Sequence, residues 1–151
     1  ERRGRDSREA VGKDRPPGRP GGRRSCMAPR VEILVFGCRE DDLAVLRTIA
    51  GLRGSRVMTA DSAGEFARHA IDRHPLAVFL GIGSRTLAYL DVIPVIHAVH
   101  KYLPVIVVAE KDSLKLERSA REKSIFYYLV HPMDGAEVGA LLKSVMRFGR
   151  G

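Results

Sequence analysis

The sequence predicts an α/β protein of the (βα)5 type, in which five strands form a doubly wound, five-stranded parallel sheet with helices on both faces. Short runs of β-branched and aliphatic residues alternate five times with longer stretches whose apolar residues recur at helical spacing. The third run, LAVFL at residues 76–80, is apolar at every position. Such a run is typical of a parallel strand that is covered on both faces.

The expected strands are five or six residues long. They are residues 31–36 (VEILVF), 56–60 (RVMTA), 76–80 (LAVFL), 104–109 (PVIVVA) and 125–130 (IFYYLV). Right-handed crossovers between successive strands favour the doubly wound open sheet over other arrangements of these elements.

The expected helices follow the strands. They are residues 41–53, a helix after the Ser62-x-x-Glu65 capping box, residues 90–102, residues 113–123, and a helix that starts at Asp134-x-x-Glu137. Pro94 is compatible only with a first turn, so the third regular helix should start near Asp91 or later. In chain order, the apolar residues at helical spacing are Leu43, Leu46, Ile49 and Leu52; Phe66, Ala70 and Ile71; Val92, Ile96 and Val99; Leu116 and Ala120; and Val138, Leu141, Leu142 and Val145.

Composition limits the class of protein. The chain has 151 residues, 44% of them hydrophobic and 29% charged, which fits one globular domain. No apolar run approaches the roughly 20 residues that span a bilayer, and no signal-peptide pattern opens the chain. Cys26 and Cys38 are the only cysteines, so a disulfide framework is not expected. We expect a cytoplasmic protein.

The amino-terminal 29 residues differ from the rest. Residues 1–26 hold nine Lys or Arg against four acids, so they carry most of the net charge of +8. Arginine, glycine and proline dominate and little can be buried, which predicts a disordered tail over residues 1–29, with Met27 as a natural start. An alternative is an arm that binds nucleic acid phosphates through these arginines.

Ligands of open α/β sheets bind beyond the carboxyl ends of the strands. Those ends are Gly37-Cys38, Gly81, Ala109-Glu110 and His131-Pro132. They contain neither a complete glycine-rich phosphate loop nor a group of carboxylates for Mg²⁺, so no cofactor and no metal is expected. We interpret Glu40, Asp41 and Asp42 as the cap and first turn of a helix.

One alternative uses the sheet edge for chemistry. Cys38 and His131 could form a thiolate–imidazole pair that binds a small ligand or takes part in redox chemistry. Two ligands are too few for a closed zinc site, and no third candidate follows from the pattern.

Residues 31–148, with the fifth-strand phrase FYYLVHP, resemble the receiver domains of two-component response regulators. The resemblance implies the flavodoxin-like, CheY-like fold with strand order 2-1-3-4-5, in a domain of residues 30–149. It also implies that Pro132 keeps the family's cis-proline place and that Tyr128 occupies the place of its switch aromatic.

The chemical positions of the family are all changed in this sequence. The resemblance places the family's acid pair at Gly37 and Cys38, its phosphoacceptor aspartate at Gly81, its Ser or Thr at Ala109 and its lysine at His131. Aspartyl phosphorylation needs a carboxylate nucleophile, a divalent metal and a cation. The resemblance therefore implies a pseudo-receiver that is not an enzyme and that acts independently of phosphorylation.

Receivers commonly act through the face of their fourth and fifth helices, by dimerising or by docking a partner. We expect a mixed-charge interface here for a homodimer or a heterologous signalling protein. Its residues would be Lys115, Arg118, Arg121, Glu122, Lys143 and Arg147. The alternative is that this charged helix is simply solvated.

A subgroup is also indicated. FLGIGS (residues 79–84) and YLPVIVV (residues 102–108) are similar to phrases in the amino-terminal pseudo-receivers of sigma-54-dependent transcription regulators. Such a role implies a part in transcription regulation. Nucleic acid would then be bound through output domains outside this sequence, or through the basic tail.

Overall fold

The computed structural model describes residues 31–83 and 85–150, with the side chains of residues 32–83 and 85–147. The predicted disordered tail and the possible nucleic-acid-binding arm, both within residues 1–29, lie outside the described residues. Among the described helices, none has the length and apolar character needed to cross a membrane.

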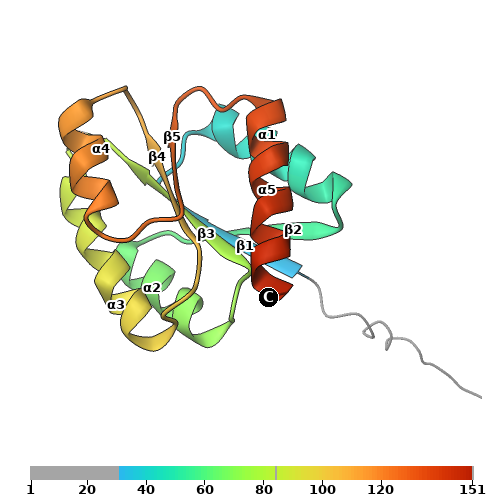
Figure 1. Ribbon diagram of the computed structural model, residues 1–151, viewed down its shortest axis with the longest axis horizontal. Helices are drawn as coiled ribbons and strands as arrows, with labels where there is room; N and C mark the ends of the chain where they lie inside the picture. The colour runs from blue at the N-terminus through green and yellow to red at the C-terminus, as the bar shows by residue number, and fades with distance from the viewer. Residues whose placement is uncertain (1–30, 84, 151) are drawn as a thin grey trace, which may run out of the picture. The chain divides into compact units, whose positions relative to one another are not determined.

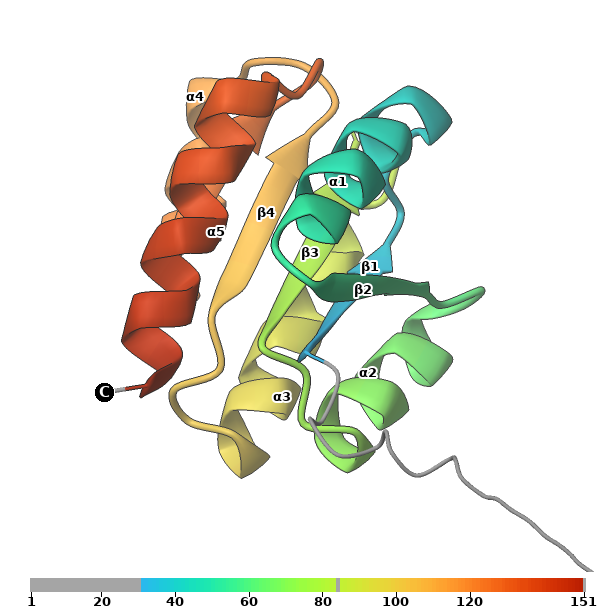
Figure 2. The same cartoon turned by 90° about the vertical axis from the view of Figure 1, so that its right-hand side faces the viewer.

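Five parallel strands form the sheet in the order β2-β1-β3-β4-β5, which confirms the predicted topology (Figure 1). The strands are β1 Val31–Phe36, β2 Ser55–Thr59, β3 Ala77–Ile82, β4 Val105–Ala109 and β5 Tyr127–Val130. The sheet is twisted, so that β2 is strongly rotated relative to β4 (Figure 2).

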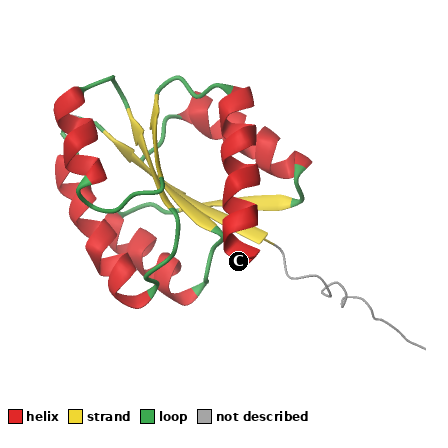
Figure 3. Ribbon diagram, in the orientation of Figure 1, coloured by secondary structure: helices red, strands yellow, loops and turns green. Residues whose placement is uncertain are grey.

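Helices cover both faces of the sheet (Figure 3). They are α1 Glu40–Leu52, α2 Ala63–Asp72, α3 Val92–Val99, α4 Leu114–Arg121 and α5 Gly135–Arg150, with a 3₁₀ segment, η2 Leu87–Asp91, before α3. Buried side chains of α1 and α5 share one core cluster, and those of α2, α3 and α4 share the other. The core therefore consists of two layers, one on each side of the sheet.

Strand β3 confirms the prediction of a strand apolar on both faces, because all of its residues are buried. Val78 and Leu80 pack into the cluster under α2, α3 and α4, whereas Ala77 and Phe79 pack under α1 and α5. The strand runs two residues beyond the predicted end at Leu80. Gly81 and Ile82 extend it because they pair with Val108 and Ala109 of β4.

The third helix is shorter than predicted. Regular α-helix starts at Val92, which leaves Pro94 in the first turn as expected, but it ends at Val99 rather than at residue 102. The predicted cap of α2 is present: Ser62 Oγ accepts a hydrogen bond from Glu65 N at 3.1 Å.

Two residues at helical spacing are exposed, and Ile71 of α2, which was expected to be buried, is only partly buried. Leu52 is 80% exposed because it is the last residue of α1, beyond the part of the helix that packs on the sheet. Val99 is 55% exposed. Helix α3 buries Ile93 and Ile96, and at 100° per residue Val99 lies about 90° from the centre of that pair.

Candidate functional site

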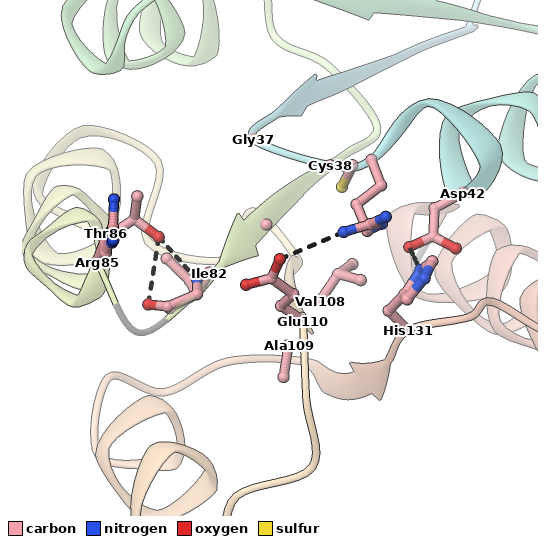
Figure 4. A pocket seen from close by; sticks show the side chains of 13 residues that line it. Gly37, Cys38, Asp42, Ile82, Arg85, Thr86, Val108, Ala109, Glu110 and His131 are labelled. Atoms are coloured by element: carbon pink, nitrogen blue, oxygen red, sulfur yellow. Dashed lines mark hydrogen bonds and ion pairs between the residues drawn. The ribbon is translucent and has the colours of Figure 1, made fainter.

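The carboxyl ends of β1, β3, β4 and β5 surround one cavity of about 360 Å³. Six of the residues that the sequence places at strand ends line it, together with Arg39, Asp42 and Thr86 (Figure 4). Those six are Gly37, Cys38, Gly81, Ala109, Glu110 and His131. Pro132 follows His131 through a cis peptide bond. The structure thus brings these positions together, as the topology predicts.

Gly37 and Gly81 bring two backbone segments into direct contact on the floor of this cavity. A Cβ atom built on Gly81 would lie 2.8 Å from Cys38 N and closer still to the Gly37 carbonyl. A Cβ on Gly37 would lie 2.7 Å from the Gly81 carbonyl oxygen, and the φ angle of Gly37 is +82°. Since real Cβ atoms do not approach other atoms within 3.0 Å, neither position accepts a side chain without moving backbone.

Asp42 is the principal polar residue of the site and is only 2% exposed. One of its carboxylate oxygens accepts a hydrogen bond from Met133 N at 2.9 Å, and the other lies 2.6 Å from His131 Nδ1. The two side chains point toward each other in Figure 4. Asp42 therefore ties the first turn of α1 to the segment that connects β5 and α5.

Sequence reasoning assigned Asp42 to a helix cap and first turn, and only part of that interpretation is correct. The three acids do lie in the first turn, but the N-cap is Arg39, whose side chain makes no capping hydrogen bond. The buried role of Asp42 was missed. Its position four residues before Leu46 was the available signal, because residues i and i+4 share a helix face.

An ion pair crosses the mouth of the cavity. Arg39 Nη1, from the segment after β1, lies 3.3 Å from Glu110 Oε2, just beyond β4. Both side chains are about half exposed, so the pair contributes at most about 1 kcal/mol. Glu110 also lies over Gly83, where a Cβ would approach its carboxylate to 2.6 Å.

The Cys38 thiol is poorly suited to nucleophilic or metal chemistry. Burial raises its pKa from 9.0 to about 12, and the charge of Asp42 adds to that shift. The thiolate is the nucleophile and the metal ligand, so a thiol with this pKa stays unreactive near neutral pH. Cys38 and His131 share the cavity, but the pKa does not favour the alternative of a reactive pair.

One group of described residues has the composition of a metal site: Asp41, Asp42 and His131, with ligand atoms within 4.8 Å of one another. Two of the three are already satisfied within the protein, because Asp42 and His131 bond to each other. The second oxygen of Asp42 is occupied by Met133 N. This arrangement is better described as a structural tether than as a set of free ligands.

Tyr128 and the charged helices lie away from the cavity floor. Tyr128 is buried, and its hydroxyl donates a long hydrogen bond to the Ser113 carbonyl at 3.5 Å. The six charged residues of the predicted interface are all exposed: Lys115, Arg118, Arg121, Glu122, Lys143 and Arg147. Arg121 pairs with Glu117 on its own helix at 2.9 Å, and none of the other five forms an ion pair within the described part of the chain.

Comparisons with known proteins give consistent results. No family model matches the sequence. The Transcriptional regulatory protein PrrA of Mycobacterium leprae and that of Mycobacterium tuberculosis are each 32% identical to this chain over 120 residues. The match covers 80% of this chain and 51% of each relative, so the chain spans about half the length of these proteins.

Solved structures share the fold at lower identity. NtrX from Brucella abortus in complex with ADP has a TM-score of 0.66 and 22% identity, covering 80% of this chain and 28% of that one. A CheY-like receiver domain protein from Methanospirillum hungatei has a TM-score of 0.62 and 15% identity, covering 80% and 98%. The receiver domain of a putative Luxo repressor protein from Vibrio parahaemolyticus has a TM-score of 0.68 and 11% identity, covering 80% and 93%.

Proposed function

The chain belongs to the response regulator receiver family, and we propose that it is a phosphorylation-independent receiver that acts in transcription regulation by protein–protein contact. It would perform no enzymatic step of its own. The observation that carries this proposal is the backbone contact between Gly37 and Gly81.

Phosphoryl transfer to a receiver needs a carboxylate at the position that Gly81 occupies. Glycine offers no acceptor oxygen, and the space that a side chain would fill is taken by the backbone of Gly37 and Cys38. Ala109 has no hydroxyl with which to bind a phosphoryl oxygen. The one basic side chain among the family's chemical positions, His131, is bonded to Asp42. These features support the loss of phosphoryl transfer in this chain, and they do not favour a related reaction in its place.

The divalent metal that the family uses does not fit the corresponding positions. Mg²⁺ binds oxygen ligands, mainly carboxylates and carbonyls, in near-octahedral geometry. Gly37 and Gly81 offer no side-chain oxygen, and Cys38 offers a protonated thiol, since burial raises its pKa to about 12. No step of the proposed function passes through a metal.

Contacts between protein groups connect the strand ends around this cavity, where other members of the family bind the metal and the phosphoryl group. Asp42 ties α1 to the segment after β5, and Arg39 ties the segment after β1 to the end of β4. Together with the glycine contact, they join the strand ends without any ligand. This supports a receiver that holds one conformation constitutively.

The output of such a domain must come from its surface. We propose that the exposed charged face of α4 and α5, with Arg118 and Lys143 as representative residues, docks a signalling partner. Its mixed charges give specificity and rate more than affinity. The relatives are named as transcriptional regulatory proteins, so we propose a cytoplasmic role in a larger regulator. The phrases at residues 79–84 and 102–108 favour the sigma-54-dependent subgroup.

A phosphodonor experiment tests phosphorylation independence. The full chain is incubated with acetyl phosphate or phosphoramidate and Mg²⁺ beside a receiver that retains its aspartate, and intact mass is measured. We expect the control to gain one phosphoryl group and this chain to gain none. A hydroxylamine-labile phosphoryl group on this chain would refute the proposal.

A further inference from the structure

Helix α3 has an apolar outer face. Val95 and Val99 are 53% and 55% exposed, and Tyr102, just past the helix, is 72% exposed. Pro94, just before Val95, and Ala98, just before Val99, are also exposed. No Asp, Glu, Lys or Arg occurs from residue 92 to residue 100. We call Pro94, Val95, Ala98, Val99 and Tyr102 the α3 stripe.

The stripe is one continuous surface rather than scattered residues. At 100° per residue, its four helical members fall within an arc of about 140°, opposite the buried Ile93 and Ile96. The neighbouring helix α4 is different, because its exposed residues include Lys115, Arg118 and Glu122. An apolar centre beside a charged rim is the usual composition of a protein–protein interface.

Charges at the two ends of the stripe are of opposite sign. Asp91 precedes the stripe, with a side chain 79% exposed, and the exposed Lys101 lies beside Tyr102 at the other end. Lys101 Nζ lies 5.5 Å from the centre of the Tyr102 ring, so its charge is held at the end of the stripe. Asp91 also lies 3.5 Å from Lys123 Nζ, and most of its carboxylate remains open to solvent.

We propose that the α3 stripe binds the same stripe of a second copy of this chain, with the two helices antiparallel about a two-fold axis. In such a contact, residue i meets residue j and residue j meets residue i. The four helical members of the stripe are centred between Val95 and Ala98, with Asp91 and Lys101 on opposite sides of that centre. Antiparallel pairing therefore sets Asp91 of each copy beside Lys101 of the other, whereas parallel pairing would oppose like charges.

A small residue makes the pairing sterically reasonable. Ala98, near the centre of the helical members, allows the helix axes to approach closely, and Pro94, Val95 and Val99 supply the apolar contact. This inference rests on the proposed function of action by protein–protein contact, and it identifies a second copy of the chain as the partner of the α3 stripe. The charged face of α4 and α5 is left free for a heterologous protein.

Solution mass tests the inference. Light scattering or sedimentation of the full chain is measured from micromolar to millimolar concentration. We expect a reversible dimer whose dissociation constant rises about tenfold or more in Val99→Glu. Leu52→Glu is the matched control, since Leu52 is an equally exposed aliphatic residue on α1 and should have no effect. Circular dichroism checks that both variants fold, and Val95→Glu provides a second disruption.

Charge reversal tests the antiparallel geometry. Lys101→Glu should weaken the dimer several-fold, and adding Asp91→Lys should restore it. A monomer at every concentration, or a dimer that Val99→Glu leaves intact, would overturn the inference. If Arg118→Glu instead breaks the dimer, self-association lies on the charged face, which removes the α3 inference and keeps the proposed function. Only phosphorylation of the chain would remove the latter.

Discussion

Replacing Gly81 by alanine tests directly the close contact between Gly81, at the end of β3, and Gly37, after β1. The substitution adds one methyl group and no charge, in a strand where alanine is otherwise tolerated better than glycine. Its Cβ would meet Cys38 N at 2.8 Å and the Gly37 carbonyl at a shorter distance. Both neighbours are backbone, and Gly37 has a positive φ, so neither can yield by a side-chain rotation.

The expected effect is a loss of stability. Forced overpacking typically costs about 1–3 kcal/mol, more than the roughly 0.5–1 kcal/mol that alanine gains over glycine within a strand. The net loss is then up to about 2.5 kcal/mol, so with a urea m-value of about 1–3 kcal/mol/M the midpoint of unfolding should fall by up to roughly 2 M. Gly81→Asp should lose more, because it also buries a carboxylate against the same backbone, and it should not gain a phosphoryl group from acetyl phosphate.

Gly64→Ala is the matched control. Gly64 lies in the first turn of α2, and apart from its chain neighbours and the backbone of its own helix no atom lies within 4 Å of the place that its Cβ would take. Alanine there should therefore leave stability unchanged or raise it by up to about 1 kcal/mol. Urea unfolding followed by circular dichroism measures both variants. If Gly81→Ala proves as stable as the parent protein, the segments at the ends of β1 and β3 are not in the close contact described here.

Two further predictions concern the cavity walls. Asp42→Ala should lower the free energy of unfolding by about 2–4 kcal/mol, since it leaves His131 and Met133 N without their hydrogen-bond partner. The control Asp41→Ala, at an exposed residue, should change it by less than about 1 kcal/mol. Equal effects of the two substitutions in urea unfolding would contradict the buried tether. In a Cys26→Ser background, native Cys38 should react with iodoacetamide far more slowly at pH 8 than the unfolded chain does. Because folding raises the pKa of Cys38, its contribution to stability is complete below pH 9 and is lost between pH 9 and about 12, a loss that Cys38→Ala should abolish.

The sequence was sufficient for the topology and for most of the core. Periodicity of two or 3.6 residues is a local property, and it located all five strands and the buried residues of α4 and α5. Local periodicity also explains the errors. Periodicity cannot fix the rotation of a helix about its axis to better than one residue. Val99 was therefore grouped with Ile96, although α3 is rotated so that Ile93 is buried and Val99 faces outward.

The interior of the site could not be read from the sequence, because its contacts join distant segments. Asp42 and Met133 are 91 residues apart, and Arg39 and Glu110 are 71 apart. The sequence identified which positions meet at the sheet edge, since topology alone decides that. It did not show that a buried acid outside those positions would pair with His131, nor that two glycines would bring their backbones together.

The three ties at the carboxyl edge differ in strength. The glycine contact between the ends of β1 and β3 is made by backbone, and Asp42 joins α1 to the segment after β5 through buried groups. The end of β4 is joined to its neighbours by backbone hydrogen bonds from Glu110 N to the Ile82 carbonyl and from His131 N to the Ala109 carbonyl. The side-chain tie at this point is the half-exposed pair of Arg39 and Glu110. The weakest of the three ties is therefore the one at the start of the β4–α4 segment.

This segment leads into α4, whose exposed face is the one we assign to a heterologous partner. Glu110 lies four residues before Leu114, the first residue of α4, so a partner bound at the start of α4 would act close to the Arg39–Glu110 pair. Helix α3 is held differently, by Ile93 and Ile96 fully buried against the sheet. Its apolar stripe is thus held firmly on the sheet, which suits it to the contact between two copies that we propose.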